Sequence, residues 1–86
     1  VFCSDVLEHV EPECLYAVLD DIRDLARKAV VLIVATRPAM KTLADGRNAH
    51  LIVERSEWWL PKLMQRWRIR EFSDRGGQFV CVGETR

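Results

Sequence analysis

The sequence predicts an α/β fold with the element order β-α-β-α-β-β, in which the last two strands form an antiparallel hairpin. Three observations predict this fold. Residues 29–35 are a seven-residue apolar run typical of a buried strand, and a helical spacing of apolar residues precedes them. Two strand-like segments then flank a glycine-containing loop at residues 74–77. Because the chain has 86 residues, we expect a single domain that spans residues 1–86.

The first two elements are a strand and an amphipathic helix. Residues 1–6 are short, apolar and β-branched at both ends, which favours a buried strand. A turn with Glu8 and His9 follows, and the fixed φ of Pro12 suits the first position of a helix. From Glu13 onward the apolar residues follow the three-and-four spacing of a helix: Cys14, Leu15, Val18, Leu19, Ile22, Leu25 and Ala26.

The run at residues 29–35 is apolar at every position, so we expect neighbours to cover both of its faces, as they cover parallel strands. Together with residues 1–6 and the helix between them, it predicts a βαβ unit with two parallel strands. A loop rich in functional groups follows, and it includes Arg37, Asn48 and His50.

The second helix is expected at residues 57–65, with Ser56 as its N-cap and Pro61 within its first turns. Its adjacent Trp58 and Trp59 point about 100° apart on a helix, so we expect one to pack on the sheet. The other should reach a rim or a partner.

The closing hairpin is predicted at residues 68–73 and 78–84. The first of these strands is polar and should lie at the edge of the sheet. The second is apolar and should lie inside the sheet.

Composition excludes several classes of protein. The 13 basic and 13 acidic residues cancel, so no global field draws the chain to a nucleic acid or a membrane surface. The longest apolar run is far shorter than the roughly 20 residues that span a bilayer. An odd number of cysteines without C-x-x-C spacing (Cys3, Cys14 and Cys81) argues against a disulfide framework and a zinc cluster. We therefore expect a cytoplasmic protein.

Residues 3–10, CSDVLEHV, are closed by Pro12 and resemble a D-x-L-E-H-V stretch found in many class I S-adenosylmethionine-dependent methyltransferases. In that family the stretch ends the fourth strand and leads into the next helix. The later elements follow the order of the family's second half, and residues 45–51 and 57–59 look like pieces of some bacterial and phage methyltransferases. The resemblance implies a partial Rossmann-like sheet whose last strand inserts antiparallel.

Two parts of the family pattern have no counterpart in these 86 residues. The four glycines, Gly46, Gly76, Gly77 and Gly83, form no G-x-G loop after an opening strand. The acidic residue that holds the cofactor ribose is also absent. The resemblance therefore predicts the C-terminal, acceptor-side half of such an enzyme, with little or no activity alone.

The resemblance also implies roles for residues that follow the first strand. Ser4 and Asp5 would contact the S-adenosylmethionine cofactor, and Glu8 and His9 would border the methyl acceptor. A neutral imidazole at His9 could accept the proton of that acceptor. The alternative is that Glu8 and His9 only cap the turn.

The second candidate group lies in and after the long loop. We expect His50 to have a catalytic role, as Glu8 and His9 do, and Arg37, Asn48 and Trp58 to bind a small-molecule acceptor. Solvation of the loop groups and core packing of the tryptophan are the alternatives. A zinc site of Cys3, His9 and His50 has no recognisable ligand spacing, so we expect no metal.

Two other functions compete with the methyltransferase. An unpaired opening strand at residues 1–6 would make the chain a non-enzymatic interaction module that forms a homodimer. Nucleic-acid binding is disfavoured, because Glu71 and Asp74 interrupt the one basic group with an aromatic residue nearby. That group comprises Arg66, Trp67, Arg68, Arg70 and Arg75.

Overall fold

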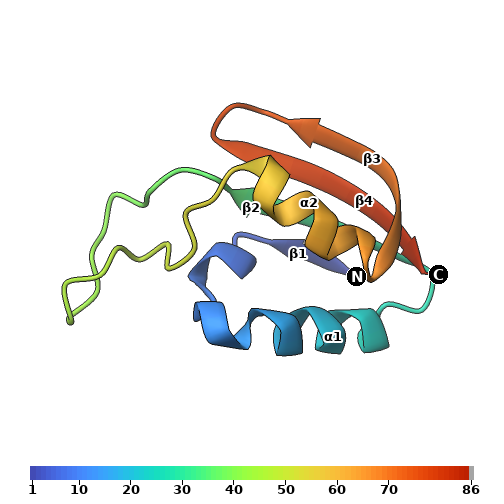
Figure 1. The fold of residues 1–86 in the computed structure, drawn as a ribbon, viewed down its shortest axis with the longest axis horizontal. Coiled ribbons are helices and arrows are strands. Elements are labelled where there is room, and N and C mark those ends of the chain that lie inside the picture. The colour runs from blue at the N-terminus through green and yellow to red at the C-terminus, as the bar shows by residue number, and fades with distance from the viewer. Residues whose placement is uncertain (86) are drawn as a thin grey trace.

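The computed structural model describes residues 1–85. Its elements are, in order, β1 (Phe2–Ser4), the 3₁₀ turns η1 (Leu7–His9) and η2 (Pro12–Cys14), α1 (Leu15–Leu25), β2 (Ala29–Ala35), α2 (Ser56–Met64), β3 (Trp67–Asp74) and β4 (Gln78–Thr85). Figure 1 shows a long loop, residues 36–55, that extends from the end of the sheet opposite both chain ends. The α/β class and the order of the strands and helices are confirmed.

The four strands form one mixed open sheet in the order β1-β2-β4-β3. Strands β1 and β2 are parallel, as predicted, and β4 is antiparallel to both β2 and β3. The polar strand β3 therefore lies at the edge and the apolar strand β4 lies inside the sheet, which confirms the hairpin prediction. Strand β1 is shorter than residues 1–6, because Asp5 adopts a positive φ of 58° and the chain turns away.

The hydrophobic core lies on one face of the sheet, beneath both helices. Alternate residues of β2, Val30, Leu32 and Val34, are fully buried together with apolar residues of α1 and α2. The intervening Val31 and Ile33 are only half-buried. The expectation that β2 is covered on both faces was wrong for the residues described, because α1 and α2 pack against the same side.

The helices begin differently from the predictions. Pro12 is the first residue of η2 rather than of α1, which starts at Leu15 and buries Leu15, Leu19 and Ile22. Ser56 is the first residue of α2 and not its N-cap, because its hydroxyl donates to Asp74 Oδ2 at 2.7 Å instead. Pro61 lies in the second turn of α2 without ending the helix.

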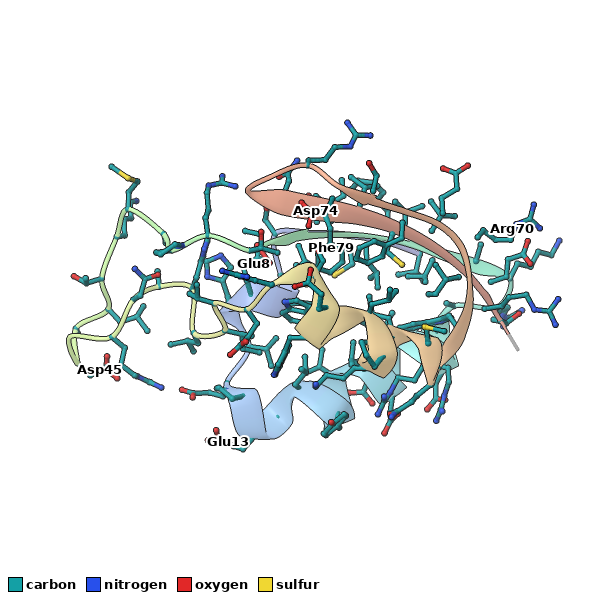
Figure 2. All side chains as sticks on the ribbon, turned by 45° about the horizontal axis from the view of Figure 1, so that its top comes forward. Glu8, Glu13, Asp45, Arg70, Asp74 and Phe79 are labelled. Carbon is teal, nitrogen blue, oxygen red and sulfur yellow. The ribbon has the colours of Figure 1, made fainter. Side chains whose placement is uncertain are left out.

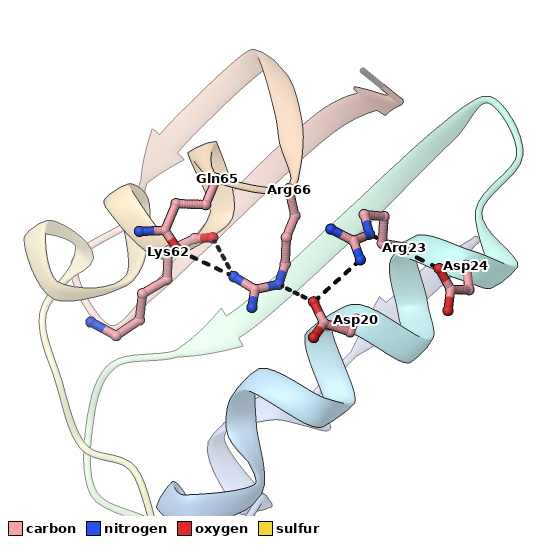
Figure 3. Close-up of polar contacts among 6 residues, drawn as sticks. All are labelled: Asp20, Arg23, Asp24, Lys62, Gln65 and Arg66. Atoms are coloured by element: carbon pink, nitrogen blue, oxygen red, sulfur yellow. Dashed lines mark hydrogen bonds and ion pairs between the residues drawn. The ribbon is translucent and has the colours of Figure 1, made fainter.

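Two contacts of α2 fix it to the rest of the molecule. Trp59 is fully buried against Phe79, as predicted for one of the two tryptophans, whereas Trp58 is half-buried and packs edge-on against Trp59. Just beyond the helix, Arg66 donates to Asp20 of α1 (Figure 3).

Within residues 1–85, no helix has the length and apolar character required to cross a membrane.

Candidate functional site

A pocket of about 370 Å³ lies where β1 and β2 end and the long loop begins. It is lined by residues from η1 and from the loop: His9, Arg37, Pro38, Ala39, Met40, Lys41, Ala49 and His50. The carboxyl ends of parallel strands are the common position for ligands in open α/β sheets. The volume is in the range of small-molecule sites, so this pocket is the candidate functional site.

His9 and His50 meet in the pocket although they come from different parts of the chain. Their ring centroids are 4.8 Å apart, and the rings meet edge to face. Nδ1 of His9 lies 2.8 Å from the Ala49 carbonyl oxygen, and Nδ1 of His50 lies 2.6 Å from the Arg37 carbonyl oxygen. A carbonyl oxygen only accepts, so each Nδ1 donates its proton, and in the neutral form of each ring the lone pair lies on Nε2.

Glu8 lies behind the two imidazoles and is fully buried. Figure 2 shows its side chain where the long loop leaves the body of the molecule, at the opposite end of the sheet from Arg70. Among residues 1–85, neither of its carboxylate oxygens has a hydrogen-bond partner. One ligand atom each from Glu8, His9 and His50 lies within 4.8 Å of the others. The structure thus brings together all three residues predicted for the catalytic role.

The backbone around this group is held by the loop itself. Asn48 accepts the Ala39 and His50 amide protons on Oδ1 and donates from Nδ2 to the Ala39 carbonyl. Asn48, predicted to bind substrate, therefore has its amide engaged with the backbone and positions His50. The Ile52 amide also donates to the Glu8 carbonyl, which ties η1 to the end of the loop.

A salt bridge fastens the loop to the turn before α1. Arg47 forms a bidentate pair with Glu11, with both donor–acceptor distances at 2.9 Å, and also binds Asp45 at 2.7 Å. The hydrogen bond from Arg47 lowers the pKa of the Glu11 carboxyl below its usual value. The Arg47 amide and guanidinium likewise lower the pKa of Asp45. These contacts fix the loop over the pocket.

Two cationic side chains give the pocket its charge. Arg37, predicted to bind substrate, lines the pocket and donates from its guanidinium to the Gly77 carbonyl at 2.9 Å. Lys41 lines the same pocket and escaped the sequence prediction, although a lysine so close to Arg37 in the same loop was a usable signal. Together the two cations favour an anionic ligand.

The two residues predicted to hold the cofactor, Ser4 and Asp5, precede His9 in the sequence and are not among the residues that line the pocket. The Ser4 hydroxyl donates to the Asp5 carboxylate at 3.4 Å, and the Asp5 amide donates to Ile33 of β2. Asp5 has a positive φ, which is uncommon for a residue other than glycine. Residues in this conformation cluster at functional sites in proteins. Trp58 is not among the lining residues and is instead covered by Lys62, whose Nζ is 3.9 Å from the ring centroid.

The basic group that includes Trp67 is not a continuous nucleic-acid surface. Trp67 is fully buried and cannot stack on a base. Arg66 is buried and pairs with Asp20, while Arg70 pairs with Glu84. That nucleic acid is not a partner stays a prediction.

Comparison of the chain with protein-family models, curated proteins and solved structures finds no match. The resemblance to methyltransferases therefore has no support beyond the sequence motif and the order of the elements.

Proposed function

We propose that this chain forms the acceptor-side part of an S-adenosylmethionine-dependent methyltransferase, with a Rossmann-like sheet. The observation that carries the proposal is the position of His9 and His50, which line one pocket at the carboxyl ends of the parallel strands β1 and β2. The motif that resembles the methyltransferase family, residues 3–10, supplies β1, the turn after it and one of the two imidazoles.

The proposed reaction needs a base beside the acceptor. A lone pair of the acceptor attacks the methyl carbon of the sulfonium, and the carbon–sulfur bond breaks with its electrons on sulfur. The acceptor proton passes to Nε2 of His9 or His50, the nitrogen that each Nδ1–H···O=C bond leaves unprotonated. Arg37 and Lys41 would hold a negatively charged acceptor in place.

Cofactor contact is proposed for Ser4 and Asp5, at the end of β1. Because the chain contains no glycine-rich loop after an opening strand, we expect these two residues to bind S-adenosylmethionine only weakly by themselves. The test is a titration of the ¹⁵N-labelled chain with S-adenosylhomocysteine, followed by amide chemical shifts. We expect millimolar affinity, with shifts concentrated between Ser4 and His9.

A matched pair of variants makes this test specific. Asp5→Asn should abolish the shifts, whereas Asp21→Asn, which changes an exposed carboxylate on α1, should leave them unchanged. Shifts that are absent at millimolar ligand, or that survive Asp5→Asn, would rule out cofactor contact at the end of β1. Tight binding with methyl transfer would show instead that the chain acts alone.

A second candidate, a homodimeric interaction module, is favoured by the exposed edge of the sheet. Strand β1 lies at that edge, and Phe2 is 67% exposed. Pairing of two β1 strands would continue the sheet and cover this residue. Sedimentation of the chain should then show a dimer that Phe2→Lys dissociates and Leu25→Lys, a change on an equally exposed residue of α1, does not. A monomer at high micromolar concentration would exclude this function.

A further inference from the structure

Three side chains of the candidate site form a group that neither the motif nor the general-base chemistry accounts for. Glu8 is fully buried with both carboxylate oxygens unpartnered among residues 1–85. Burying a carboxylate is costly unless a cation or hydrogen-bond donors compensate it. The structure describes neither an ion pair nor a hydrogen bond between Glu8 and the two imidazoles. None of the described side chains therefore compensates the buried carboxylate of Glu8.

The two histidines present the features of metal ligands. In each ring Nδ1 donates to a backbone carbonyl, which fixes the tautomer and orients the ring with its Nε2 lone pair free. Histidines that bind metals almost always donate their second nitrogen in this way. The carbonyls belong to Ala49 and Arg37, so both orienting groups come from the long loop.

The spacing of the three ligand atoms fits one ion. One nitrogen of each imidazole and one carboxylate oxygen of Glu8 all lie within 4.8 Å of one another. Around a metal with bonds of about 2.1 Å, neighbouring ligand atoms lie about 3.0–3.5 Å apart, so the widest of the three separations would close by roughly 1.3–1.8 Å on binding. Glu8 and His9 are adjacent in η1, whose carbonyl at Glu8 is bonded to Ile52, and Asn48 holds the backbone of His50. These hydrogen bonds hold the backbone of the proposed ligands in place.

We propose that Glu8, His9 and His50 bind a divalent transition-metal ion. Two imidazole nitrogens and one carboxylate suit zinc, iron(II) or manganese(II), whereas Ca²⁺ and Mg²⁺ prefer sites built from oxygen alone. A three-residue ligand set leaves coordination positions open, which is the arrangement of catalytic rather than structural metal sites. His9 and His50 line the pocket, so those open positions face it.

The pocket defines what else the metal would bind. A divalent ion with one carboxylate and two neutral imidazoles keeps a net positive charge, and Arg37 and Lys41 add two more cations to the wall. The site therefore takes an anionic oxygen ligand, such as a carboxylate, an enolate or a phosphate. That this oxygen belongs to the methyl acceptor rests on the proposed function, whereas the metal site itself does not. A metal on both Nε2 atoms would occupy the lone pairs that accept the proton in the metal-free chain, so in the metal-bound form the ion would favour the deprotonated acceptor instead.

The test is a titration of the chelator-treated chain with Zn²⁺ by calorimetry and with Co²⁺ by visible absorption. We expect one equivalent of each metal to bind. We also expect long-range ¹H–¹⁵N spectra to show Zn²⁺ on Nε2 of both rings, with Nδ1 still protonated. His9→Asn and His50→Asn, which change exposed or half-exposed side chains, should each weaken Zn²⁺ binding by at least about 10- to 100-fold.

Glu8→Gln should weaken Zn²⁺ binding to a similar extent, and its folding is checked by circular dichroism. The matched control is Glu13→Gln, which changes an exposed carboxylate in η2 and should bind as the unaltered chain does. Cys3→Ser and Cys14→Ser should also leave the affinity unchanged. Failure to bind, affinity insensitive to His50→Asn, or loss of binding in a cysteine variant would each overturn the proposal. None of these readouts involves S-adenosylmethionine, so the metal site and the methyltransferase function can fail separately.

Discussion

Among residues 1–85, two charged side chains are buried, Arg66 and Glu8, and their surroundings differ. At the junction of the two helices, Arg66 is buried and donates to Asp20 at 2.8 Å and to the Lys62 carbonyl at 3.2 Å. At the carboxyl end of β1 and β2, Glu8 is buried more completely and has no partner among the described residues. Figure 3 shows the first of these regions, in which the contacts come from α1, α2 and the two residues that follow α2.

The difference separates a structural charge from a functional one. Arg66 is compensated by the fold, so its role is to hold α1 against α2. Glu8 adds a desolvation cost that nothing in the described chain offsets, beside two histidines whose rings are already oriented. Such incomplete polar groups are expected where a ligand completes the site. The following predictions test that distinction.

Removal of the carboxylate that compensates Arg66 should have the largest effect on stability. Asp20→Ala leaves a buried guanidinium without its anionic partner, so we expect the free energy of unfolding to fall by about 2 kcal/mol. Urea denaturation followed by tryptophan fluorescence measures this change. Asp24→Ala is the control, because Asp24 is 75% exposed and should cost less than about 0.5 kcal/mol. Equal losses of stability in Asp20→Ala and Asp24→Ala would contradict the structural role of Arg66.

The corresponding change at Glu8 should have the opposite sign when metal is absent. Glu8→Gln replaces a buried charge by a neutral group of the same shape, so in the presence of a chelator we expect unchanged stability or a gain of about 1 kcal/mol. The measurement is the same denaturation curve, with Glu13→Gln as the exposed control. A loss of more than about 1 kcal/mol in chelator would mean that the protein itself compensates Glu8.

Sequence reasoning predicted the fold to the extent that local patterns determine it. The apolar run of β2 gave its bounds without error, and the contrast between polar β3 and apolar β4 placed both in the sheet. It failed where tertiary contacts decide. The hydroxyl of Ser56 donates to Asp74, which lies 18 residues away in the sequence, so it does not cap α2. The one-sided covering of β2 depends on where both helices pack, which the composition of the strand does not encode.

The candidate site was predicted as residues but not as an arrangement. Glu8, His9 and His50 were each predicted as candidate residues, but their grouping within 4.8 Å was not predicted. One histidine lies in η1 and the other in the long loop, so they have no regular spacing in the sequence, and only the fold brings their rings to 4.8 Å. The burial of Glu8 could not be predicted from the sequence either, since it depends on how η1 folds under the end of the loop.

A smaller effect is expected from the salt bridge that fastens the loop. Arg47→Ala removes the contacts to Glu11 and Asp45, all of which are largely exposed, so global stability should change little. Amide exchange of Leu43 and Ala49, whose N–H groups bond within the loop, should accelerate several-fold. Exchange of β4 amides serves as the internal control. Uniform acceleration throughout the chain would mean that the bridge supports the whole fold.

The smallest effect concerns Asp74, a carboxylate that is exposed and fully partnered, in contrast to Glu8. The Gly76 amide and the Ser56 hydroxyl hold the pKa of Asp74 below its usual value. A lowered pKa stabilises the fold above the unfolded value of about 3.9, and that contribution is lost as the pH falls through the folded value. Asp74→Asn should therefore be slightly less stable near neutral pH, and its urea midpoint should converge with that of the unaltered chain in acid.

The control is Asp21→Asn, whose urea midpoint should run parallel to that of the unaltered chain at every pH, because Asp21 is an exposed carboxylate of α1. If Asp74→Asn also runs parallel down to the most acid pH, these hydrogen bonds do not favour the ionised form.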